Sequence, residues 1–384
     1  MTGTVLTLNA GSSSIKFAAY TADAQPERLL RGHIDGVGRE ATLTLKTGTG
    51  QVTHPVSAPS HDAALPVIID ALSDAVGARP VVGVGHRIVH GGPERAAPVR
   101  LDVQTLDALA VFNPLAPLHQ PHNLSAVHAA IAAFPNAIQV GCFDTAFHRS
   151  HSWVNDAFAI PRKYYEKGVR RYGFHGLSYD YITRRLAADF PTLAGQRICI
   201  AHLGNGASMC ATHEGRSVAS TMGFSPLDGL PMGTRSGQID PGVLLYLLET
   251  EGVSTTELGD MLYKQSGLLG LSGISSDMRA LQASDRPEAK QAIDYFVFRI
   301  RREVGAMAAI LGGLDGLVFC GGIGENAATI RARIVEGLGF LGLEVDAASN
   351  DANAIRIGAG RVPILVIPTD EEFVIADAVV RHLA

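Results

Sequence analysis

Short β-branched apolar runs alternate with segments of helical periodicity along almost the whole chain, which predicts an α/β fold. Residues 289–311 carry one apolar helical face, since Ile293, Phe296, Ile300 and Val304 recur three or four positions apart. Strands are predicted at residues 5–8, 15–20, 81–84, 137–140, 198–201, 317–319 and 364–367. Helices are predicted at residues 63–76, 106–109, 121–133, 177–189, 241–250, 289–311, 327–338 and 371–383.

Two segments of the chain share a strand–turn–strand pattern. Residues 6–16 read Leu-Thr-Leu-Asn-Ala-Gly-Ser-Ser-Ser-Ile-Lys, and residues 200–210 read Ile-Ala-His-Leu-Gly-Asn-Gly-Ala-Ser-Met-Cys. Each pattern is typical of a hairpin whose glycine-rich turn cradles phosphate. The repeat predicts two similar domains that face one nucleotide. The alternative is chance, because Gly-Ser turns recur readily in a chain with 42 glycines.

The size and charge of the chain narrow the class of protein. At 384 residues it exceeds what one hydrophobic core usually serves, so two domains are expected. The formal charge is -5 with no block of like charges, which disfavours nucleic acid and anionic membrane as partners. No apolar stretch approaches the ~18 residues of a membrane span, and the N-terminus lacks a secretion signal. The four cysteines form no CxxC pair; buried, reduced thiols predict a cytoplasmic protein.

The first chemical motif is the segment from Asn9 to Lys16. Ser12 and Ser14 offer hydroxyl groups to phosphate oxygens, and Lys16 shares a strand face with Ser14 because it lies two residues further on. The segment is not a P-loop, since no GxxxxGK[ST] pattern occurs. It predicts a phosphate site, with a polar hairpin and a solvated lysine as the alternative.

Two further motifs follow predicted strands. Arg87 stands at the end of an apolar strand and before glycines, where its planar donor fork suits a carboxylate or phosphate. Asp144 follows the strand at 137–140 and can orient Mg²⁺ or a reacting group, or simply cap a turn. His86 and His90 are spaced poorly for a shared metal on a strand, so a metal site there is disfavoured.

The second half of the chain supplies a histidine and another arginine. His175 precedes a predicted helix for which Ser178 is a plausible N-cap, and it can donate to a transferring phosphoryl group or pack in a core. Arg235 lies in a glycine-flanked loop. Together with Arg87 it gives two guanidinium groups, which can stabilise the negative charge on a phosphoryl group during its transfer. A structural salt bridge is the alternative for Arg235.

The last two motifs lie near the C-terminus. Residues 322–326 form a glycine loop between a strand and a helix, but they lack the GxGxxG spacing of a dinucleotide site, so contact with an adenosine group is the better interpretation. Thr369 with Glu372 matches a capping box, which leaves Glu371 free to face a cleft.

Together these segments resemble the acetate kinase family, short-chain carboxylate kinases of the actin, Hsp70 and sugar-kinase superfamily. The resemblance spans Asn9 to Glu372 in the order of that family. It implies two duplicated actin-like (ribonuclease H-like) domains with an active-site cleft between them. The expected domains are residues 1–146 with 371–384, and residues 147–370, which would bind the nucleotide. It also implies a homodimer.

The resemblance further assigns roles to individual residues. Asn9 and Glu371 would organise Mg²⁺, with Mn²⁺ as an alternative ion, and Ser12, Ser14 and Lys16 would line the phosphate path. Arg87 would bind the carboxylate or acyl phosphate, Asp144 would be the active-site acid, and His175 and Arg235 would stabilise the transition state. Val89, Leu118 and Pro226 would form a small methyl pocket. The nucleotide would be held by His202, Leu203, Gly204, Asn205, Gly206, Asp277, Met278, Arg279, Gly322, Ile323, Gly324, Glu325 and Asn326.

The function that follows is reversible, Mg²⁺-dependent transfer of a phosphoryl group from ATP to acetate, giving acetyl phosphate and ADP. Propionate, with one more methylene, remains an alternative acceptor. A sugar kinase is less consistent with two arginines in glycine-flanked loops, and a nucleotide-binding chaperone or filament protein would form no acyl phosphate. Three residues depart from the family pattern: Gln238 replaces an acidic residue, Ser225 replaces a threonine, and Met278 replaces an aromatic residue or leucine.

Overall fold

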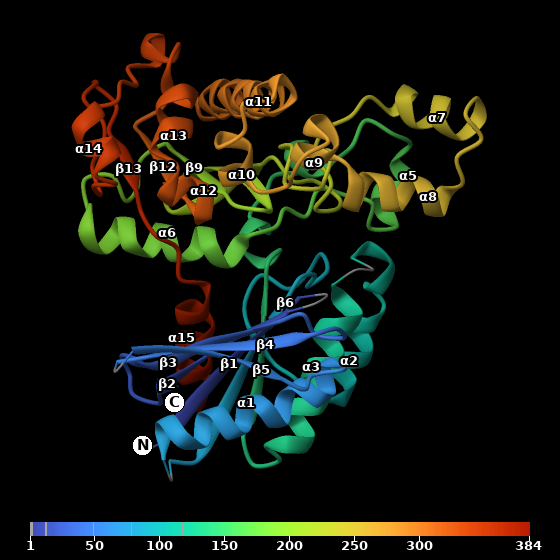
Figure 1. Cartoon of the computed structure of the whole chain (residues 1–384), viewed down its shortest axis with the longest axis vertical. Coiled ribbons are helices and arrows are strands. Elements are labelled where there is room, and N and C mark those ends of the chain that lie inside the picture. Colours follow the sequence, from blue (N-terminus) through green and yellow to red (C-terminus); the bar gives the residue numbers. More distant parts are fainter. Residues whose placement is uncertain (1–2, 12–13, 49, 78, 117–118) are drawn as a thin grey trace. The chain divides into compact units, whose positions relative to one another are not determined.

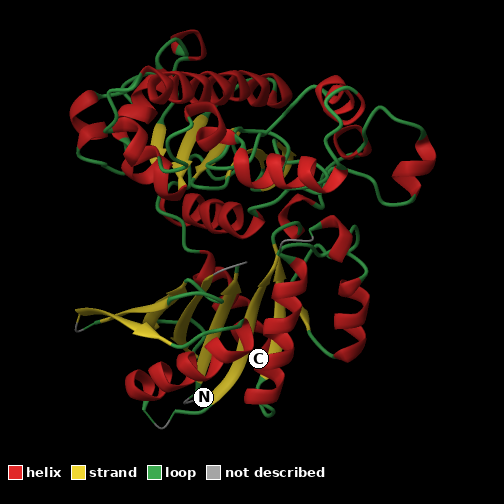
Figure 2. Ribbon diagram, turned by 45° about the vertical axis from the view of Figure 1, so that its right-hand side comes forward, coloured by secondary structure: helices red, strands yellow, loops and turns green. Residues whose placement is uncertain are grey.

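A computed structural model describes residues 3–11, 14–48, 50–77, 79–116 and 119–384. The chain divides into two compact units. Unit 1 comprises Met1–Arg149 and Asp370–Ala384, and unit 2 comprises Ser150–Thr369 (Figure 1). Each unit contains one β-sheet with helices packed against it (Figure 2).

Within the described residues, the sheet of unit 1 has eight strands in the order β5-β4-β3-β2-β1-β6-β8-β7. Strands β5 to β1 are joined antiparallel, whereas β1, β6 and β8 run parallel to one another. The strands are β1 (Thr4–Ala10), β2 (Ser14–Thr21), β3 (Arg28–Asp35), β4 (Ala41–Thr47), β5 (Gly50–Val56), β6 (Val81–Ile88), β7 (Val99–Arg100) and β8 (Ile138–Phe143).

Helices bury both faces of this sheet near its parallel strands. Apolar residues of α1 and α3 pack with those of β1 to β4 in one core, which includes Phe17, Leu43 and Ile68. On the other face, α15 lies so close to β6 that a Cβ atom at Gly83 or Gly85 would collide with its side chains. The helical segments of unit 1 are α1 (His61–Val76), α2 (Val103–Ala110), η1 (Asn113–Leu115), α3 (Gln120–Ala133), η2 (Ala146–His148) and α15 (Glu371–Leu383).

The sheet of unit 2 has the order β11-β10-β9-β12-β13 within the described residues. Its strands are β9 (Ile198–Leu203), β10 (Ala207–His213), β11 (Arg216–Ser220), β12 (Gly316–Cys320) and β13 (Ile364–Val366). Its helical segments are α4 (Trp153–Asp156), α5 (Arg162–Glu166), α6 (Gly176–Asp189), α7 (Pro241–Glu249), α8 (Thr255–Asp260), η3 (Met261–Gln265), α9 (Gly267–Ser272), α10 (Met278–Gln282), α11 (Pro287–Leu311), α12 (Gly321–Asn326), α13 (Ala328–Val335), η4 (Gly339–Leu341) and α14 (Ala347–Asp351).

The two sheets contain the same five-strand core. In unit 1 the order β3-β2-β1-β6-β8 has two antiparallel joints followed by two parallel joints, and β11-β10-β9-β12-β13 repeats this order and these directions in unit 2. The hairpins β1–β2 and β9–β10 are therefore equivalent, which confirms the duplication predicted from their sequences. This repeated arrangement is the actin-like, ribonuclease H-like fold.

The predicted elements all occur, with ends shifted by a few residues. The predicted strand at 137–140, for example, runs to Phe143, and the predicted helix at 327–338 ends at Val335. Among the helices that the structure describes, none combines the length and the apolar character that crossing a bilayer requires.

Candidate active site

In unit 1, three predicted site residues meet where parallel strands end. Asn9 lies near the end of β1, Arg87 near the end of β6, and Asp144 directly after β8. The Arg87 side chain donates from Nε to Asp144 Oδ1 over 3.0 Å, from Nη2 to Oδ2 over 2.5 Å, and from Nη1 to Asn9 Oδ1 over 3.0 Å. The carboxyl ends of parallel strands meet at one edge of a sheet, which is where ligands bind in open α/β sheets.

The Arg87 guanidinium is held as a cation at this edge. Burial alone would lower its pKa, but the carboxylates of Asp144, Glu371 and Glu372 raise the pKa above its ordinary value. The side chain of Asp144 is 2% exposed and that of Arg87 is 19% exposed. Within the described residues, the hydrogen bonds of Arg87 use Nε–H and one N–H on each terminal nitrogen. One N–H on each terminal nitrogen therefore remains to receive an anion.

Glu371 stands at the first position of α15, and close packing brings this helix to the same edge. A Cβ atom at Gly85 would lie 2.4 Å from the Ile375 side chain, so glycine permits the approach of α15 to β6. Burial raises the pKa of Glu371 to about 7; Arg87 and Lys16 lower it, while Asp144 and Glu372 raise it further. Since burial is the main cause of this raised pKa, a cation beside the carboxylate would stabilise its ionised form.

These residues suit Mg²⁺ by the chemistry of their donors. Asn9, Asp144 and Glu371 would coordinate a cation only through oxygen atoms, which are the ligands that Mg²⁺ prefers. The residues that the structure describes contain no group of three or more His, Cys, Asp or Glu placed to hold a metal ion. Mg²⁺ usually takes only one or two carboxylates and completes its shell with water and substrate phosphates, so this donor set fits the ion.

The predicted phosphate hairpin borders Asn9. Lys16 is paired with Asn9 across β1 and β2, and its side chain is exposed, whereas Ile15 and Phe17 on either side are buried. Gly11 N donates to Ser14 O over 2.7 Å, which closes the turn. Ser14 and Lys16 share a face as predicted. Ser12 lies outside the described residues, and so does Leu118 of the predicted methyl pocket.

The other two residues of the predicted methyl pocket belong to different units. Val89 follows β6 in unit 1 and is buried, and its backbone N–H donates to Asn123 Oδ1 over 3.0 Å. Pro226 belongs to unit 2, where its carbonyl oxygen accepts a hydrogen bond from Arg235 Nη1 over 2.9 Å. A methyl pocket formed by Val89, Leu118 and Pro226 stays a prediction.

In unit 2, His175 occupies an unusual backbone position. Its φ is 58° in the left-handed region, directly before α6, and this conformation is costly for a residue with a Cβ atom. Its Nδ1 lies 2.9 Å from Ser208 Oγ, and its ring stacks on that of His202 with 4.4 Å between centroids. These contacts orient the imidazole so that its Nε2 lies beside Gly206 in the β9–β10 turn.

Gly206 also brings Arg235 beside His175. A Cβ atom at Gly206 would lie 2.9 Å from Nη2 of Arg235 and 3.3 Å from Nε2 of His175. The loop that carries Arg235 is fixed to the hairpin, since Gly233 N donates to Asn205 O over 3.0 Å. The structure therefore brings together His175, Arg235 and the β9–β10 turn within unit 2.

The predicted nucleotide residues of unit 2 lie at the end of β9, in the β9–β10 turn, in α12 and at the start of α10. Residues 322–326, expected to form a glycine loop, belong instead to the short helix α12. A Cβ atom at Gly204 would lie 3.9 Å from the backbone nitrogen of Gly322, which joins the β9–β10 turn to the start of α12. Glu325 binds backbone instead of solvent, because its Oε1 accepts from Gly321 N over 2.9 Å and from Thr369 N over 3.1 Å. Asn326 Nδ2 donates to Gly322 O over 2.9 Å within α12.

Residues 277–279 have structural contacts of their own. Asp277 caps α10 by accepting from Arg279 N over 2.8 Å, and the Arg279 side chain pairs with Asp277 over 2.6 Å. Met278 is buried. Ser276, the residue before them, has its carbonyl oxygen 3.2 Å from a Cβ built at Gly233, so this segment adjoins the Arg235 loop. A nucleotide-binding role for the three residues stays a prediction.

Two capping assignments made from the sequence are wrong. The N-cap of α15 is Asp370, whose side chain accepts from Phe373 N over 3.1 Å, and not Thr369 with Glu372. The N-cap position of α6 is His175, and Ser178 lies inside the helix. Ser178 Oγ instead lies 2.8 Å from His202 Nδ1 and 2.9 Å from Thr369 Oγ1, and thus holds the histidine that stacks on His175.

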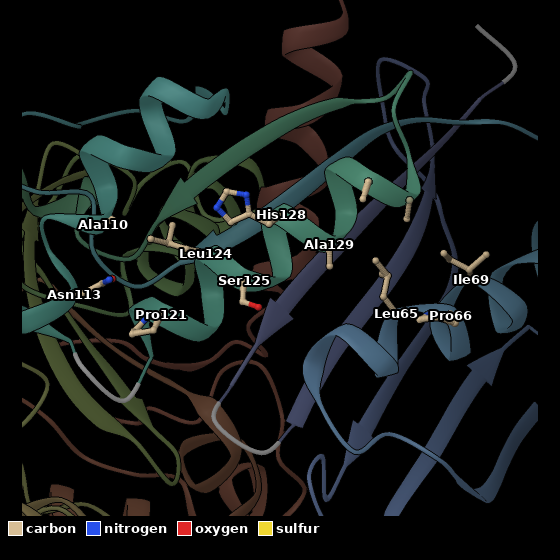
Figure 3. A pocket seen from close by; sticks show the side chains of 12 residues that line it. Leu65, Pro66, Ile69, Ala110, Asn113, Pro121, Leu124, Ser125, His128 and Ala129 are labelled. Carbon is tan, nitrogen blue, oxygen red and sulfur yellow. The ribbon is translucent and has the colours of Figure 1, made fainter.

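A hollow of about 780 Å³ in unit 1 is unrelated to these residues. It lies between α1 and α3, where Leu65, Ile69, Leu124 and Ala129 line it (Figure 3). Its described lining contains no predicted site residue. The candidate chemistry lies instead at the strand ends of unit 1 and in the loops of unit 2.

The duplicated fold, with basic side chains at strand ends and in turns, suits a class of protein, the actin-like phosphotransferases. A profile of the acetokinase family matches residues 4–377. The acetate kinase of Methylocella silvestris is 52% identical over 391 residues, covering 98% of this chain and 97% of that protein. The chain belongs to the acetokinase family.

Solved structures of the family agree with this fold. The crystal structure of Porphyromonas gingivalis acetate kinase matches with a TM-score of 0.90 and 36% identity, covering 100% of both chains. The crystal structure of a propionate kinase from Francisella tularensis subsp. tularensis SCHU S4 matches with a TM-score of 0.92 and 36% identity, covering 98% of each chain.

Proposed function

We propose that this chain is an acetate kinase, which transfers the γ-phosphoryl group of ATP to the carboxylate of acetate and yields acetyl phosphate and ADP, reversibly. The observation that carries the proposal is the Arg87 cluster at the strand ends of unit 1. There Asp144 and Asn9 hold the guanidinium while one N–H on each terminal nitrogen stays available to an anion. Membership of the acetokinase family supports the same reaction.

In this proposal the acceptor needs no base. A carboxylic acid is already ionised at neutral pH, so the protein must bring two anions together and not remove a proton. Arg87 binds the acetate carboxylate or the acyl phosphate formed from it, because its two remaining N–H groups match two oxygen atoms. Asp144 keeps the guanidinium in place by accepting hydrogen bonds from its Nε and its Nη2.

We assign the donor nucleotide to the loops of unit 2. Gly204, Asn205 and Gly206 form the turn between β9 and β10, and the start of α12 adjoins it, where a Cβ atom at Gly322 would meet open space into which a nucleotide can enter. The side chains of His175 and Arg235 stand beside this turn and donate to the oxygens of the transferring group.

The proposed step is a direct, in-line displacement. An oxygen of acetate forms a bond to the γ-phosphorus as the bond from that phosphorus to the β–γ bridging oxygen breaks. ADP leaves with the electron pair, and no proton is transferred. We propose that Arg87, Lys16, His175 and Arg235 all act on this one phosphoryl group, where positive charge offsets the repulsion between two anions.

Mg²⁺ would be held near Asn9 and Glu371, and when bound it would neutralise charge on the phosphates. The support is the oxygen-only donor set and the raised pKa of Glu371 described above. The test is calorimetric titration of Mg²⁺ with ADP into the wild type and Glu371→Gln. We expect weaker Mg²⁺ uptake by the variant together with a higher Mg²⁺ requirement for turnover. Equal affinities would remove Glu371 from the site.

The proposed function is tested by trapping acyl phosphate with hydroxylamine in the presence of ATP, Mg²⁺ and acetate. We expect acetate-dependent acyl hydroxamate and matching ADP. A parallel series with propionate sets the acceptor preference, because one methylene changes pocket affinity by about 1–3 kcal/mol. A higher kcat/KM for propionate would replace acetate as the substrate. ADP formation without any acyl hydroxamate would contradict the whole class of reaction.

We also propose that the protein is a homodimer that uses α7 and α11. No described residue of α7 is buried, although the helix carries Leu245 and Tyr246, which are 56% and 52% exposed. Phe298 of α11 is 61% exposed. Gln238, which precedes α7, accepts from Arg299 on α11 over 2.9 Å, so the segment that leads into α7 contacts α11. Such a patch usually marks an interface.

Sedimentation velocity tests the dimer. We expect the wild type to sediment as a dimer and Leu245→Glu to sediment as a monomer, since a charge on this face prevents burial. Val103→Glu is the matched control, because Val103 is 70% exposed on α2 of unit 1. A monomeric wild type, or a dimeric Leu245→Glu variant, would contradict the proposed interface. A cytoplasmic location is proposed too, because the four cysteines are buried and form no disulfide within the described residues.

A further inference from the structure

The first turns of α3 hold the backbone on both sides of the Arg87 cluster. Asn123 is 2% exposed and lies on the inner face of the helix. Its Nδ2 donates to Ala10 O over 2.7 Å, and its Oδ1 accepts from Val89 N over 3.0 Å. Ala10 follows Asn9 directly, and Val89 follows Arg87 by two positions. One carboxamide therefore joins the end of β1 to the segment after β6.

The Asn123 carboxamide takes the place of backbone hydrogen bonds beyond the end of the β1–β6 ladder. The parallel ladder between β1 and β6 runs as far as Leu8 opposite His86. Beyond that pair, Asn123 supplies an acceptor to one strand and a donor to the other, as a peptide group would. A carboxamide offers the donor and the acceptor on two separate atoms, and both partners are buried, so either lost bond would leave a polar group unsatisfied.

Neighbouring side chains of α1 and α3 act on the same two segments. Gln120 accepts from His90 N over 3.0 Å and donates to His90 O over 2.9 Å, which fixes the residue after Val89. His61 Nε2 donates to Gly11 O over 2.6 Å, since a carbonyl oxygen only accepts, and its ring stacks on His122 with 4.9 Å between centroids. The turn of the phosphate hairpin and the Arg87 segment are thus both attached to the start of α3.

We propose that Asn123 is a positioning residue for phosphoryl transfer, because its carboxamide sets the spacing between the phosphate hairpin that follows Asn9 and the acceptor-binding segment that contains Arg87. The inference rests on the proposed function. Asn123 touches neither substrate in this account. It acts through the backbone at Ala10 and Val89, and a displacement of about 1 Å between reacting groups can cost about a hundredfold in rate.

The test compares Asn123→Ala and Asn123→Asp with Val127→Ala. The alanine variant loses both hydrogen bonds. The aspartate variant keeps an acceptor for Val89 N but places a carboxylate oxygen against Ala10 O. Val127 lies one turn further along α3, is fully buried, and belongs to one core cluster with Ile88, Leu124 and Phe143, so its truncation destabilises unit 1 while both hydrogen bonds of Asn123 stay in place.

We measure the melting temperature of each protein, and then kcat, KM for acetate and the dissociation constant of ADP at one temperature well below all the melting temperatures. We expect both Asn123 variants to lose at least about tenfold in kcat, because alignment fails in the transition state. ADP affinity should stay within about threefold of wild type, since we assign the nucleotide to unit 2. Val127→Ala should have a lower melting temperature than the wild type but keep its kcat.

The proposal is overturned if either folded Asn123 variant keeps kcat within about fivefold of Val127→Ala, because the residue would then be purely structural. If Asn123→Ala does not fold, Asn123→Asp decides by the same criterion, and Asn123→Ser replaces both if neither folds. Failure of the proposed function looks different: the wild type itself would form no acyl hydroxamate.

Discussion

The carboxylate of Asp144 binds the guanidinium of Arg87 through two nitrogens, Nε at 3.0 Å and Nη2 at 2.5 Å. The two residues come from neighbouring parallel strands, and the carboxylate is almost fully buried. Asp144 thus serves first to hold the arginine, which gives the residue predicted as an active-site acid a definite physical contact. Asp144 affects the reaction by fixing the position of Arg87 and by keeping its guanidinium charged.

Replacement of Asp144 should therefore affect both stability and turnover. Asp144→Ala leaves a largely buried guanidinium without its counter-charge, so we expect a loss of about 3 kcal/mol in the free energy of unfolding. Turnover should fall by about a hundredfold as Arg87 loses its orientation. Urea denaturation and the hydroxamate assay measure the two effects.

Asp228→Ala is the matched control, since Asp228 pairs with Arg171 over 3.0 Å and about a third of each side chain is exposed. It should lose less than about 1 kcal/mol of stability. A fully active Asp144→Ala variant would show that Arg87 does not need this carboxylate.

Arg235 should matter for the rate far more than for the fold. Its Nη1 donates to the Pro226 carbonyl oxygen over 2.9 Å, and its side chain stands beside Gly206 and His175. We expect Arg235→Ala to lower kcat by about 10²–10³-fold, as removal of a transition-state donor does. The melting temperature should change little.

The control is Arg185→Ala, which removes a guanidinium paired with Asp189 on the exposed face of α6. It should leave kcat unchanged. Near-normal turnover by Arg235→Ala would remove Arg235 from the proposed mechanism.

His86 should make the protein sensitive to acid. His86 directly precedes Arg87 in the chain and is buried. Its Nε2 lies 2.8 Å from Gln139 Oε1. Burial lowers its pKa to about 4, against the smaller, raising effect of that hydrogen bond. The unfolded chain takes up a proton below its ordinary pKa of about 6.5 while the folded chain does not. Stability therefore falls as the pH decreases from about 6.5 to about 4, by about 3 kcal/mol at most.

Urea denaturation of the wild type and His86→Gln at neutral and acidic pH measures this contribution. Glutamine cannot titrate, so the variant should lose stability less steeply between about pH 6.5 and about pH 4. Parallel pH profiles for the two proteins would show that His86 does not carry the effect.

Gln238 offers a stabilising substitution. Its Oε1 accepts from Arg299 over 2.9 Å and from Arg302 over 2.6 Å, so two cations share one neutral acceptor. Gln238→Glu places a negative charge between them, and we expect a gain of up to about 1 kcal/mol because the site is exposed. Thermal unfolding at low and high salt checks the prediction, since screening should reduce the gain. The same gain in an Arg299→Ala, Arg302→Ala background would contradict this explanation.

Most of the fold could be predicted because buried strands leave a clear pattern. Every residue of β1 and of β12 is buried, and both segments are recognisable as short apolar runs. By contrast, β5 has six exposed residues out of seven and presents no buried face, so nothing in its pattern distinguishes it from a loop. Its strand character comes from pairing with β4 alone.

The site could be predicted only in part, for a similar reason. Arg87, His175 and Arg235 stand in glycine-flanked segments, which draw attention to them in the sequence. Asn123 carries no such signal, because its partner Ala10 is 113 positions away and the contact exists only after folding. The α15 cap was misplaced by one residue because Thr369 bonds to Ser178, another distant contact, and leaves the cap to Asp370.

The account depends on one direct transfer between ATP and acetate, with no phosphorylated form of the protein in between. The measurement that tests it is the stereochemistry at phosphorus, using ATP made chiral at the γ-position with oxygen isotopes and analysing the acetyl phosphate formed. A single in-line displacement predicts inversion of configuration. Retention would require two successive displacements, and would contradict the proposed mechanism.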